Sequence, residues 1–445
     1  MREQSSLRMF TRYTVPSVFG TLGVSCYILA DTFFVSQGLG TAGLAALNLA
    51  IPVYNLIHGT GLMLGMGGAT RFSVCKSRND PAENGRIFTN TMRLAALFSM
   101  AFFLIGLFLS KDLARFLGAD ESVLPMTETY LRVLLIFSPT FICNDVLLCF
   151  VRNDGAPRLA MTAMLVGSFA NILLDWLFIF PLKMGIFGAV FATGLSPVIS
   201  LFVLLPHRIK RKNTFNFIKM KTNVYLSRQT FALGFSSFIA ELSSGVVMIV
   251  FNAVILRLEG NTGVAAYGVV ANLSLVLVAV YTGIAQGAQP LYSEYYGRGE
   301  HMRVRELFRF ALVAATALSF VLYLLIAANA APITAVFNSE NDLRMREIAV
   351  PGLRLYFLAS VFVGCNTVLA GFLAAVERPL PAQLLSLLRG LVLIVPMAFL
   401  LSAVWGMTGV WLAYPITESL VALVGATVAY RYRKNVSGID KGDNV

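Results

Sequence analysis

Four polar side chains in otherwise apolar segments have the types and spacing to hold a cation. Asp175 lies in the run SFANILLDWLFIF (residues 168–180), and Asn171 lies four residues before it, on the same face of a helix. Asp31 lies in GVSCYILADTFF, and Thr193 lies in GIFGAVFATGLS. Carboxylate, amide and hydroxyl oxygens are hard ligands that could bind Na⁺. Two carboxylates held close together in a low dielectric could instead share one proton, because they cannot both ionise cheaply.

Three further acids lie inside apolar segments and are candidates for a substrate cleft. They are Glu241 in FIAELSSG, Asp145 and Glu418. Each could instead be a buried structural carboxylate, and Arg389 could pair with one of them. His58 is the only histidine within an apolar segment, and we expect it to be a hydrogen-bonded core residue.

The remaining motifs argue against bound cofactors. The five cysteines are scattered and form no CxxC pair, so we expect free thiols and no cysteine metal site. The glycine cluster GTGLMLGMGGAT is not followed by GK[ST], and no other P-loop occurs, so ATP is not the expected energy source. The only bound ion we expect is a coupling ion, H⁺ or Na⁺, with Asp31, Asn171, Asp175 and Thr193 as the Na⁺ ligands if Na⁺ is used.

The composition indicates an integral membrane protein. Of the 445 residues, 57% are hydrophobic, and the mean hydropathy is +0.73. Charged residues make up 13%, about half the share that is usual in soluble domains. The net charge of +12 could suggest nucleic acid, but the basic residues cluster in short loops between apolar segments, as in cytoplasmic loops of membrane proteins. A charge inside a bilayer costs at least ~2.5–3.5 kcal/mol, so buried acids usually have a function.

Twelve apolar segments have about the 20 residues that a membrane-spanning helix needs. The first six lie at 12–36, 43–70, 91–110, 126–151, 159–180 and 185–206, and the second six at 230–256, 264–291, 307–328, 346–375, 382–402 and 407–430. The two halves resemble each other at a separation of about 220 residues: FVRNDGAPR matches FLAAVERPL, and GIFGAVFAT matches GMTGVWLAY. We therefore predict an all-α fold of two six-helix bundles, related by a pseudo-twofold axis along the membrane normal.

The distribution of Lys and Arg predicts the domain boundaries and the orientation. We expect an N-terminal lobe at 1–206, a linker at 207–229, a C-terminal lobe at 230–431 and a tail at 432–445. The linker contains seven Lys and Arg in HRIKRKNTFNFIKMKTNVYLSR. By the positive-inside rule the linker and both termini face the cytoplasm, in a multi-pass protein of the cell (inner) membrane. On this topology Asp31 and Asp175 lie about 9 Å below the outer surface, and Thr193 lies about 12 Å below it.

Nearly the whole chain resembles the MATE family of multidrug and toxic-compound extrusion transporters. The resemblance is carried by ADTFFVSQGLGTAGLAALNLAIPV, FVRNDGAPRLAMTAMLVGSFANILLDWLFIF and GIFGAVFATGLS, together with the arrangement of six plus six helices. It implies two lobes around a central cleft and export of amphiphilic cations in exchange for H⁺ or Na⁺. It also implies a cation site in the N-terminal lobe, where Asp31, Asn171, Asp175 and Thr193 match the family positions. The family's second site, in the C-terminal lobe, is matched by Glu241, but the tenth segment has no carboxylate.

Other functions remain open at this stage. The nearest alternative is a lipid-linked oligosaccharide flippase with the same two lobes, which should carry several basic residues in its cleft. Here the spans contain more acid than base, which favours a cationic cargo. An intramembrane enzyme such as a prenyltransferase would need a DDxxD motif, and none occurs, so we expect no enzymatic activity. A pore is disfavoured because no filter-like loop is present. The expected partners are small amphiphilic cations and the lipid bilayer, and we expect a monomer.

Overall fold

The computed structural model describes residues 5–78, 80–210, 212–338 and 342–442, and in these residues the regular structure is entirely helical. The N-terminal half contains α1 (Ser6–Ser77), α2 (Pro81–Phe108), α3 (Ser110–Phe116), α4 (Leu124–Ile136), α5 (Ser138–Asn153), α6 (Pro157–Ile179) and α7 (Gly185–Ile209). The C-terminal half contains α8 (Val224–Gly297), α9 (His301–Ala328), α10 (Ala330–Phe337), α11 (Leu343–Tyr356), η1 (Phe357–Ala359), α12 (Ser360–Ala375), α13 (Pro379–Leu387), η2 (Leu388–Val392) and α14 (Ile394–Gly442).

Three of these helical segments each contain two helices that meet in a sharp turn at a glycine, so each segment supplies two crossings. Gly40 in α1, Gly260 in α8 and Gly406 in α14 have φ of 66°, 62° and 54°, a region where a side chain would be strained. Eight segments of the described chain are long and apolar enough to span a membrane, and α4 with α5 forms a ninth, bent by 47°. With each reversal counted as a second crossing, the described residues contain the twelve spans predicted, and the predicted fold class is confirmed.

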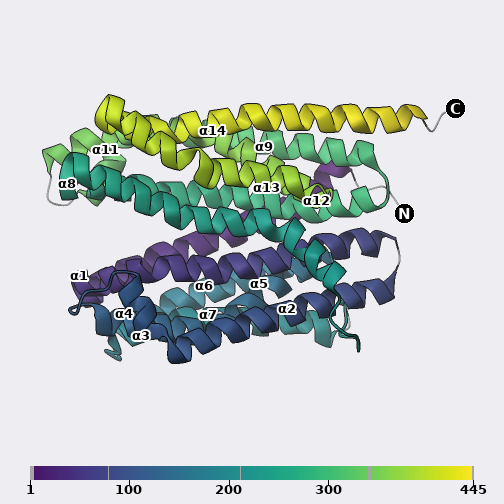
Figure 1. Ribbon diagram of the computed structural model, residues 1–445, viewed down its shortest axis with the longest axis horizontal. Helices are drawn as coiled ribbons and strands as arrows, with labels where there is room; N and C mark the ends of the chain where they lie inside the picture. Colours follow the sequence, from purple (N-terminus) through teal and green to yellow (C-terminus); the bar gives the residue numbers. More distant parts are fainter. Residues whose placement is uncertain (1–4, 79, 211, 339–341, 443–445) are drawn as a thin grey trace.

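The twelve spans form two lobes that lie side by side along their length (Figure 1). Each lobe has its own hydrophobic core. One core is built mainly from α2, α4, α5, α7 and most of α1, and the other from α8, α9 and α11–α14. The start of α1 packs on the second lobe, where Phe10 joins the core of α8. Helices α1 and α8 therefore connect the two lobes as well as belonging to them.

The internal repeat is visible in the backbone as well as in the sequence. Residues with positive φ recur about 220 positions apart, as the pairs Gly40 and Gly260, Gly155 and Glu377, and Gly185 and Gly406. The first pair also has nearly equal ψ values, −156° and −153°. Equivalent helices of the two halves thus turn at equivalent points.

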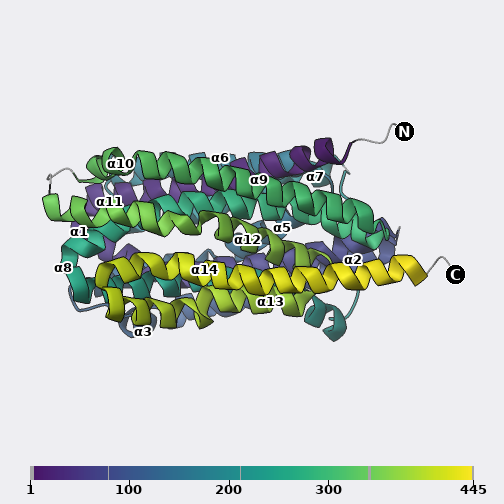
Figure 2. The same ribbon diagram turned by 90° about the horizontal axis from the view of Figure 1, so that it is seen from above.

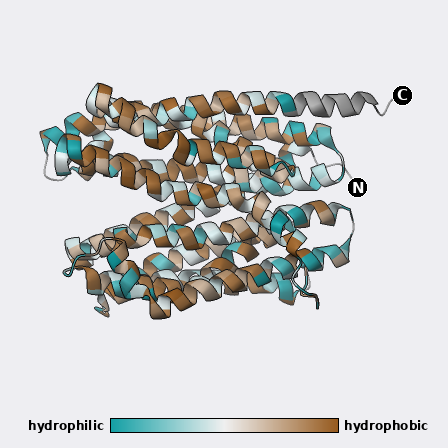
Figure 3. Cartoon of the chain, viewed as in Figure 1, coloured by the Kyte–Doolittle hydropathy of each residue, from teal (hydrophilic) through white to brown (hydrophobic). Residues whose placement is uncertain are grey.

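The described ends of the chain lie at the same end of the molecule (Figures 1 and 2). Teal, hydrophilic residues lie at this end and at the opposite end, and brown, hydrophobic residues cover the middle of the helices (Figure 3). Between the halves, α7 ends at Ile209 and α8 begins at Val224, so the non-helical connection is shorter than the predicted linker at 207–229. Within the predicted tail at 432–445, α14 continues to Gly442, and 443–445 lie outside the described residues.

Candidate functional site

The four predicted cation-site residues lie together in the N-terminal lobe, toward the end of the molecule opposite to the chain termini. Asn171 and Asp175 lie one turn apart on α6, and both are completely buried. With its amide assigned so that both atoms have partners, Asn171 donates from Nδ2 to Asp175 Oδ2 at 3.1 Å. The Asn171 carbonyl oxygen accepts from the backbone N–H of Thr193 at 3.2 Å, which ties α6 to α7.

Asp31 approaches this pair from the first half of α1, and it lies close enough to Asp175 for the two carboxylates to interact electrostatically. Asp31 and Thr193 line a cavity of about 210 Å³, whereas Asn171 and Asp175 lie behind its wall. The far side of the cavity is formed by the C-terminal lobe, including Ser244 and Met248 of α8. The site is therefore accessible from the space between the lobes through Asp31.

One oxygen of each aspartate has no hydrogen-bond partner among the described residues. These atoms are Oδ1 of Asp31 and Oδ1 of Asp175, and both are buried. A buried carboxylate oxygen without a partner carries a desolvation penalty of several kcal/mol unless a proton or a cation neutralises it. A proton or a cation bound to these two carboxylates would remove that penalty.

The hydrogen bonds of Asn171 and Thr193 limit the oxygens that this site can offer to a cation. Asn171 turns its amide nitrogen toward Asp175, and its oxygen is occupied by Thr193. The Thr193 hydroxyl donates to the carbonyl of Ala189 at 3.1 Å, so it can still accept. Across the described residues, no group of three or more His, Cys, Asp or Glu is arranged to hold a metal ion. The free oxygens are therefore one oxygen of each aspartate and the Thr193 hydroxyl.

A tyrosine that sequence reasoning missed completes the wall of the site. Tyr130 on α4 lines the same cavity and faces Asp31, Asp175 and Thr193. The predicted fourth span, 126–151, is bent by 47° where α4 meets α5 at Phe137, and the first of these helices carries Tyr130. Nothing in the spacing of LPMTETYLRVLLI could have indicated this role.

A second group of titratable residues lies deeper, between the lobes. His58 Nδ1 and Asp145 Oδ2 are 2.9 Å apart, and Glu241 faces both of them from α8. Tyr54 stacks on His58 with ring centroids 5.8 Å apart, and its hydroxyl is 2.7 Å from that of Tyr27, which lines the Asp31 cavity. The expectation that His58 is hydrogen-bonded is confirmed. Asp145, predicted as a cleft acid, has a partner in His58.

Glu418, the third predicted cleft acid, lies in the C-terminal lobe, and Arg389 neutralises it. Arg389 Nη2 is 2.9 Å from Glu418 Oε1, and Asn366 donates to Glu418 Oε2 at 2.7 Å. Arg389 also donates to Thr367 Oγ1 at 2.7 Å from within η2, a π-helical turn. This pair lines a cavity of about 220 Å³. Within the described chain, Glu241 is the one predicted cleft acid without an ion-pair partner, and it lines a neighbouring cavity of about 100 Å³ that Arg389 also lines.

The lobes touch tightly at the end of the molecule that carries the termini. A Cβ at Gly67 would lie 1.9 Å from the carbonyl oxygen of Thr230, and one at Gly234 would lie 1.8 Å from that of Met63. These impossible distances mean that α1 and α8 pack backbone to backbone. An ion pair between Arg71 Nη1 and Glu377 Oε1 at 2.7 Å also crosses between the lobes. This tight contact between the lobes, called the seam below, separates the cavity beside Asp31 from the end of the molecule that carries the termini.

A family model named MatE matches residues 16–177 and 236–400, once in each half of the chain. Among curated proteins, the multidrug export protein MepA of Staphylococcus saprophyticus is 23% identical over 444 residues, covering 99% of this chain and 97% of that protein. The protein of the same name from Staphylococcus aureus strain MSSA476 is 24% identical over 427 residues, covering 96% of this chain and 94% of that protein.

Solved structures match the fold. The outward-facing conformation of a multidrug resistance MATE family transporter of the MOP superfamily has a TM-score of 0.91 at 23% identity, covering 98% of this chain and 97% of that one. A MOP superfamily transporter from Pyrococcus furiosus, described as having a binding pocket of reverse polarity, has a TM-score of 0.89 at 23% identity, with the same coverage. At this level of identity the similarity establishes the fold.

Proposed function

The chain belongs to the MatE family of membrane transporters, and from that premise we propose that it exports amphiphilic cations from the cytoplasm in exchange for protons. It is a multi-pass membrane transporter and not an enzyme. The curated relatives named above are multidrug export proteins, which supports a multidrug cargo for this chain. The orientation we propose places the linker and both termini in the cytoplasm.

The observation that carries the proposal is the pair of orphan oxygens on Asp31 and Asp175. Asp31 lines the cavity between the lobes, and Asp175 is sealed behind it. A cation that enters the cavity therefore meets Asp31 first. A proton that neutralises Asp31 removes the charge that would hold a cationic substrate, so proton and substrate compete for the same carboxylate.

Competition becomes transport if the two ligands favour different conformations. A ligand shifts a conformational equilibrium only by its differential affinity for the two states. Asp31 is on α1, which packs against both lobes. A change of charge at Asp31 can therefore alter the contacts between the lobes. In the proposed cycle, cytoplasmic substrate binds when Asp31 is charged, and protonation of Asp31 from outside releases it.

We propose H⁺ rather than Na⁺ as the coupling ion. The support is the orientation of Asn171, which presents its amide nitrogen to Asp175 and its oxygen to the Thr193 backbone, so that neither atom is offered to a metal ion. The deeper group formed by His58, Asp145 and Glu241 contains further sites where a proton can reside.

The charges of the cavities support a cationic cargo. Asp31 and Glu241 offer carboxylates to the space between the lobes, and the positive charge of Arg389 is offset by Glu418. Attraction between a desolvated carboxylate and an organic cation is far less screened than a surface pair. The paired state of Arg389 also disfavours the flippase alternative, since a phosphate would need an unpaired base in the cleft.

Drug-resistance profiling tests this cargo. Cells that express the protein should survive lipophilic cations such as ethidium and quaternary ammonium biocides at concentrations that kill cells with an empty vector. Glu241→Gln should narrow the range of cations, because it removes a carboxylate from the space between the lobes. The matched control is Glu347→Gln, an exposed acid on α11. Protection confined to neutral or anionic compounds contradicts a cationic cargo.

A further inference from the structure

A pocket in the N-terminal lobe has no part in the proposed transport cycle. It has a volume of about 420 Å³ and is walled by apolar side chains of three helices. Representative lining residues are Met92 of α2, Leu147 of α5 and Phe202 and Leu205 of α7. Phe202 is 66% exposed and Leu205 is 45% exposed, so the mouth of the pocket opens on the outer surface of the lobe. In a membrane protein, that surface faces lipid.

The pocket runs from the middle of the lobe to its basic end. Along α5 it extends from Cys143 to Val151, which is about 12 Å of helix. At its polar end it is lined by His207 and Arg208, and by Asn213 and Asn216 of the connection between α7 and α8. An apolar slot with polar donors at one end has the layout of a site for an amphiphile.

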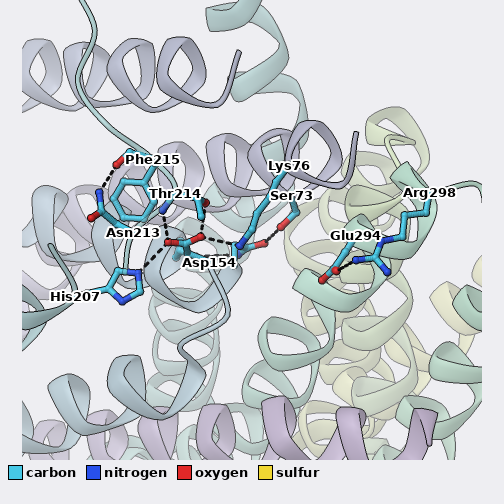
Figure 4. A network of polar contacts seen from close by, with 11 residues as sticks. Ser73, Lys76, Asp154, His207, Asn213, Thr214, Phe215, Glu294 and Arg298 are labelled. Carbon is cyan, nitrogen blue, oxygen red and sulfur yellow. Dashed lines mark hydrogen bonds and ion pairs between the residues drawn. The ribbon is translucent and has the colours of Figure 1, made fainter. Parts of the chain in front are cut away.

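Residues of the connection between the lobes line the pocket. Figure 4 shows that Asp154 holds this connection in place. Asp154 accepts from the backbone N–H of Thr214 at 2.8 Å, contacts His207 Nε2 at 2.9 Å, and forms an ion pair with Lys76 Nζ at 2.7 Å. Burial alone would raise the pKa of Asp154, but the contacts with His207 and Lys76 outweigh burial and lower it. At neutral pH the connection between α7 and α8 is therefore held by a charged carboxylate.

Aromatic packing also holds the connection between α7 and α8 in place. Phe215 is 6% exposed and packs on Phe88 and Phe150, with ring centroids 4.7 and 5.6 Å away. Arg208 lies over the ring of Phe217 at 5.8 Å, which positions its guanidinium at the mouth of the pocket. The pocket is thus covered by a well-held connection between α7 and α8, and it has a positioned positive charge at Arg208.

The charge of this region is strongly one-sided. Residues 207–228 contain seven Lys and Arg and no Asp or Glu. Juxtamembrane basic residues attract the anionic lipids of the inner leaflet, and basic pockets between membrane helices hold anionic head groups. Arg208 would repel a cationic drug, whereas it would attract a lipid phosphate.

We infer that this pocket binds one anionic phospholipid of the inner leaflet, with an acyl chain between α2, α5 and α7 and the phosphate on Arg208. The lipid packs beneath the connection that joins the two lobes. It is positioned to act on the relative movement of the lobes without touching the cation site. The inference does not depend on the identity of the cargo or of the coupling ion.

Native mass spectrometry of the purified full chain tests the site with phosphatidylglycerol and phosphatidylcholine of identical acyl chains. The unmodified protein should retain one phosphatidylglycerol more strongly than phosphatidylcholine. Arg208→Glu should lower that retention about fivefold or more, given the usual contribution of one juxtamembrane basic residue. Leu147→Trp should lower it by filling the slot, and Arg208→Lys should preserve it.

Arg8→Glu is the charge-matched control, because Arg8 is exposed at the same end of the molecule and lies outside the pocket. It should leave phosphatidylglycerol retention unchanged. Val198→Trp narrows the same slot from α7 and substitutes for Leu147→Trp if that variant does not fold. Equal retention of the two lipids by the unmodified protein would overturn the head-group assignment. Undiminished retention in a folded tryptophan variant would overturn the acyl-chain assignment.

Discussion

The buried acids of the two lobes fall into two kinds, distinguished by their partners. Asp145 and Glu418 each contact a base, His58 and Arg389 respectively. Asp31 and Asp175 have no base within ion-pair distance in the described chain, and each has an orphan oxygen. In the proposed mechanism, the acids without a base are the ones that exchange the coupling proton. Sequence spacing placed all four in the membrane but could not assign their partners.

The Arg389–Glu418 pair should be structural, and its removal should be measurable as stability. Arg389→Ala leaves Glu418 buried without its base, and breaking one partner of a buried pair costs about 3–5 kcal/mol. The melting temperature of the purified protein should fall clearly. A double variant, Arg389→Met with Glu418→Leu, should recover most of the loss, because it buries no unpaired charge. A double variant as unstable as Arg389→Ala would show that the pair is needed for more than charge balance.

The candidate site was predictable in part, and the reason lies in its residues. Asn171 and Asp175 are one turn apart, so any helix places them on one face, and their shared depth with Asp31 follows from the span boundaries. Tyr130 was not predictable, because its contact with Thr193 depends on the bend between α4 and α5. Periodicity determines which face of a helix is polar, but it does not determine how two helices meet.

At the scale of helices, glycine determines both the turns and the contact between lobes. The sequence predicted separate spans at 12–36 and 43–70. In the structure they are joined by a sharp turn at Gly40, which has a positive φ. Gly61 and Gly65, at the spacing typical of close packing, face α5: a Cβ on Gly61 would lie 2.4 Å from Asp145 Oδ2. The contact of Gly67 with α8 could not be predicted, since it joins residues more than 160 positions apart.

Gly234 should be essential for closing the seam between the lobes. In Gly234→Ala the new methyl group would meet the backbone of Met63, which cannot move aside as a side chain can. Overpacking of this kind costs about 1–3 kcal/mol, and we expect this cost to destabilise the closed conformation. The variant should expose a cysteine introduced at Thr230 to a water-soluble thiol reagent applied from the side of the termini. The labelling background is a protein whose own five cysteines are replaced.

Gly268→Ala is the matched control for this experiment. Gly268 lies in the same helical segment, α8, and a Cβ there would meet nothing within 4 Å. It should leave the labelling rate at position 230 unchanged. Equal labelling in the Gly234→Ala variant and in the control would mean that the seam does not control access from that side.

At the scale of the whole molecule, two similar lobes meet along a surface that is tight at one end and hollow at the other. The fold was predictable because hydropathy determines the spans and the repeat relates the halves. The conformational state was not predictable, because two arrangements of the same lobes would keep the same spans and the same core in each lobe. The seam at Gly67 and Gly234, with the Arg71–Glu377 pair, identifies this state as the one closed on the side of the termini.

The two lobes differ in how their charges are used. The N-terminal lobe holds the free acids beside the cavity, and the C-terminal lobe holds a neutralised pair. If the lobes move relative to each other during transport, the exchangeable charge moves with the N-terminal lobe. Protonation of Asp31 would then change the contacts of α1 with the opposite lobe, where the Thr21 hydroxyl donates to the Ala279 carbonyl at 2.8 Å.

The central claim is that Asp31 and Asp175 hold the coupling proton, and substrate flux in proteoliposomes under separately imposed ΔpH and ΔNa⁺ tests it most directly. With the unmodified protein, ΔpH alone should drive transport of a lipophilic cation, and ΔNa⁺ alone should not. Asp31→Asn and Asp175→Asn should each abolish the ΔpH-driven flux at matched protein level, whereas Asp112→Asn, at an exposed acid of α3, should leave it unchanged. Asn171→Ala should weaken the flux and Thr193→Ala should weaken it less, since a hydroxyl contributes less than an amide that donates to Asp175. Normal ΔpH-driven flux in both aspartate variants would contradict the claim and make these carboxylates structural.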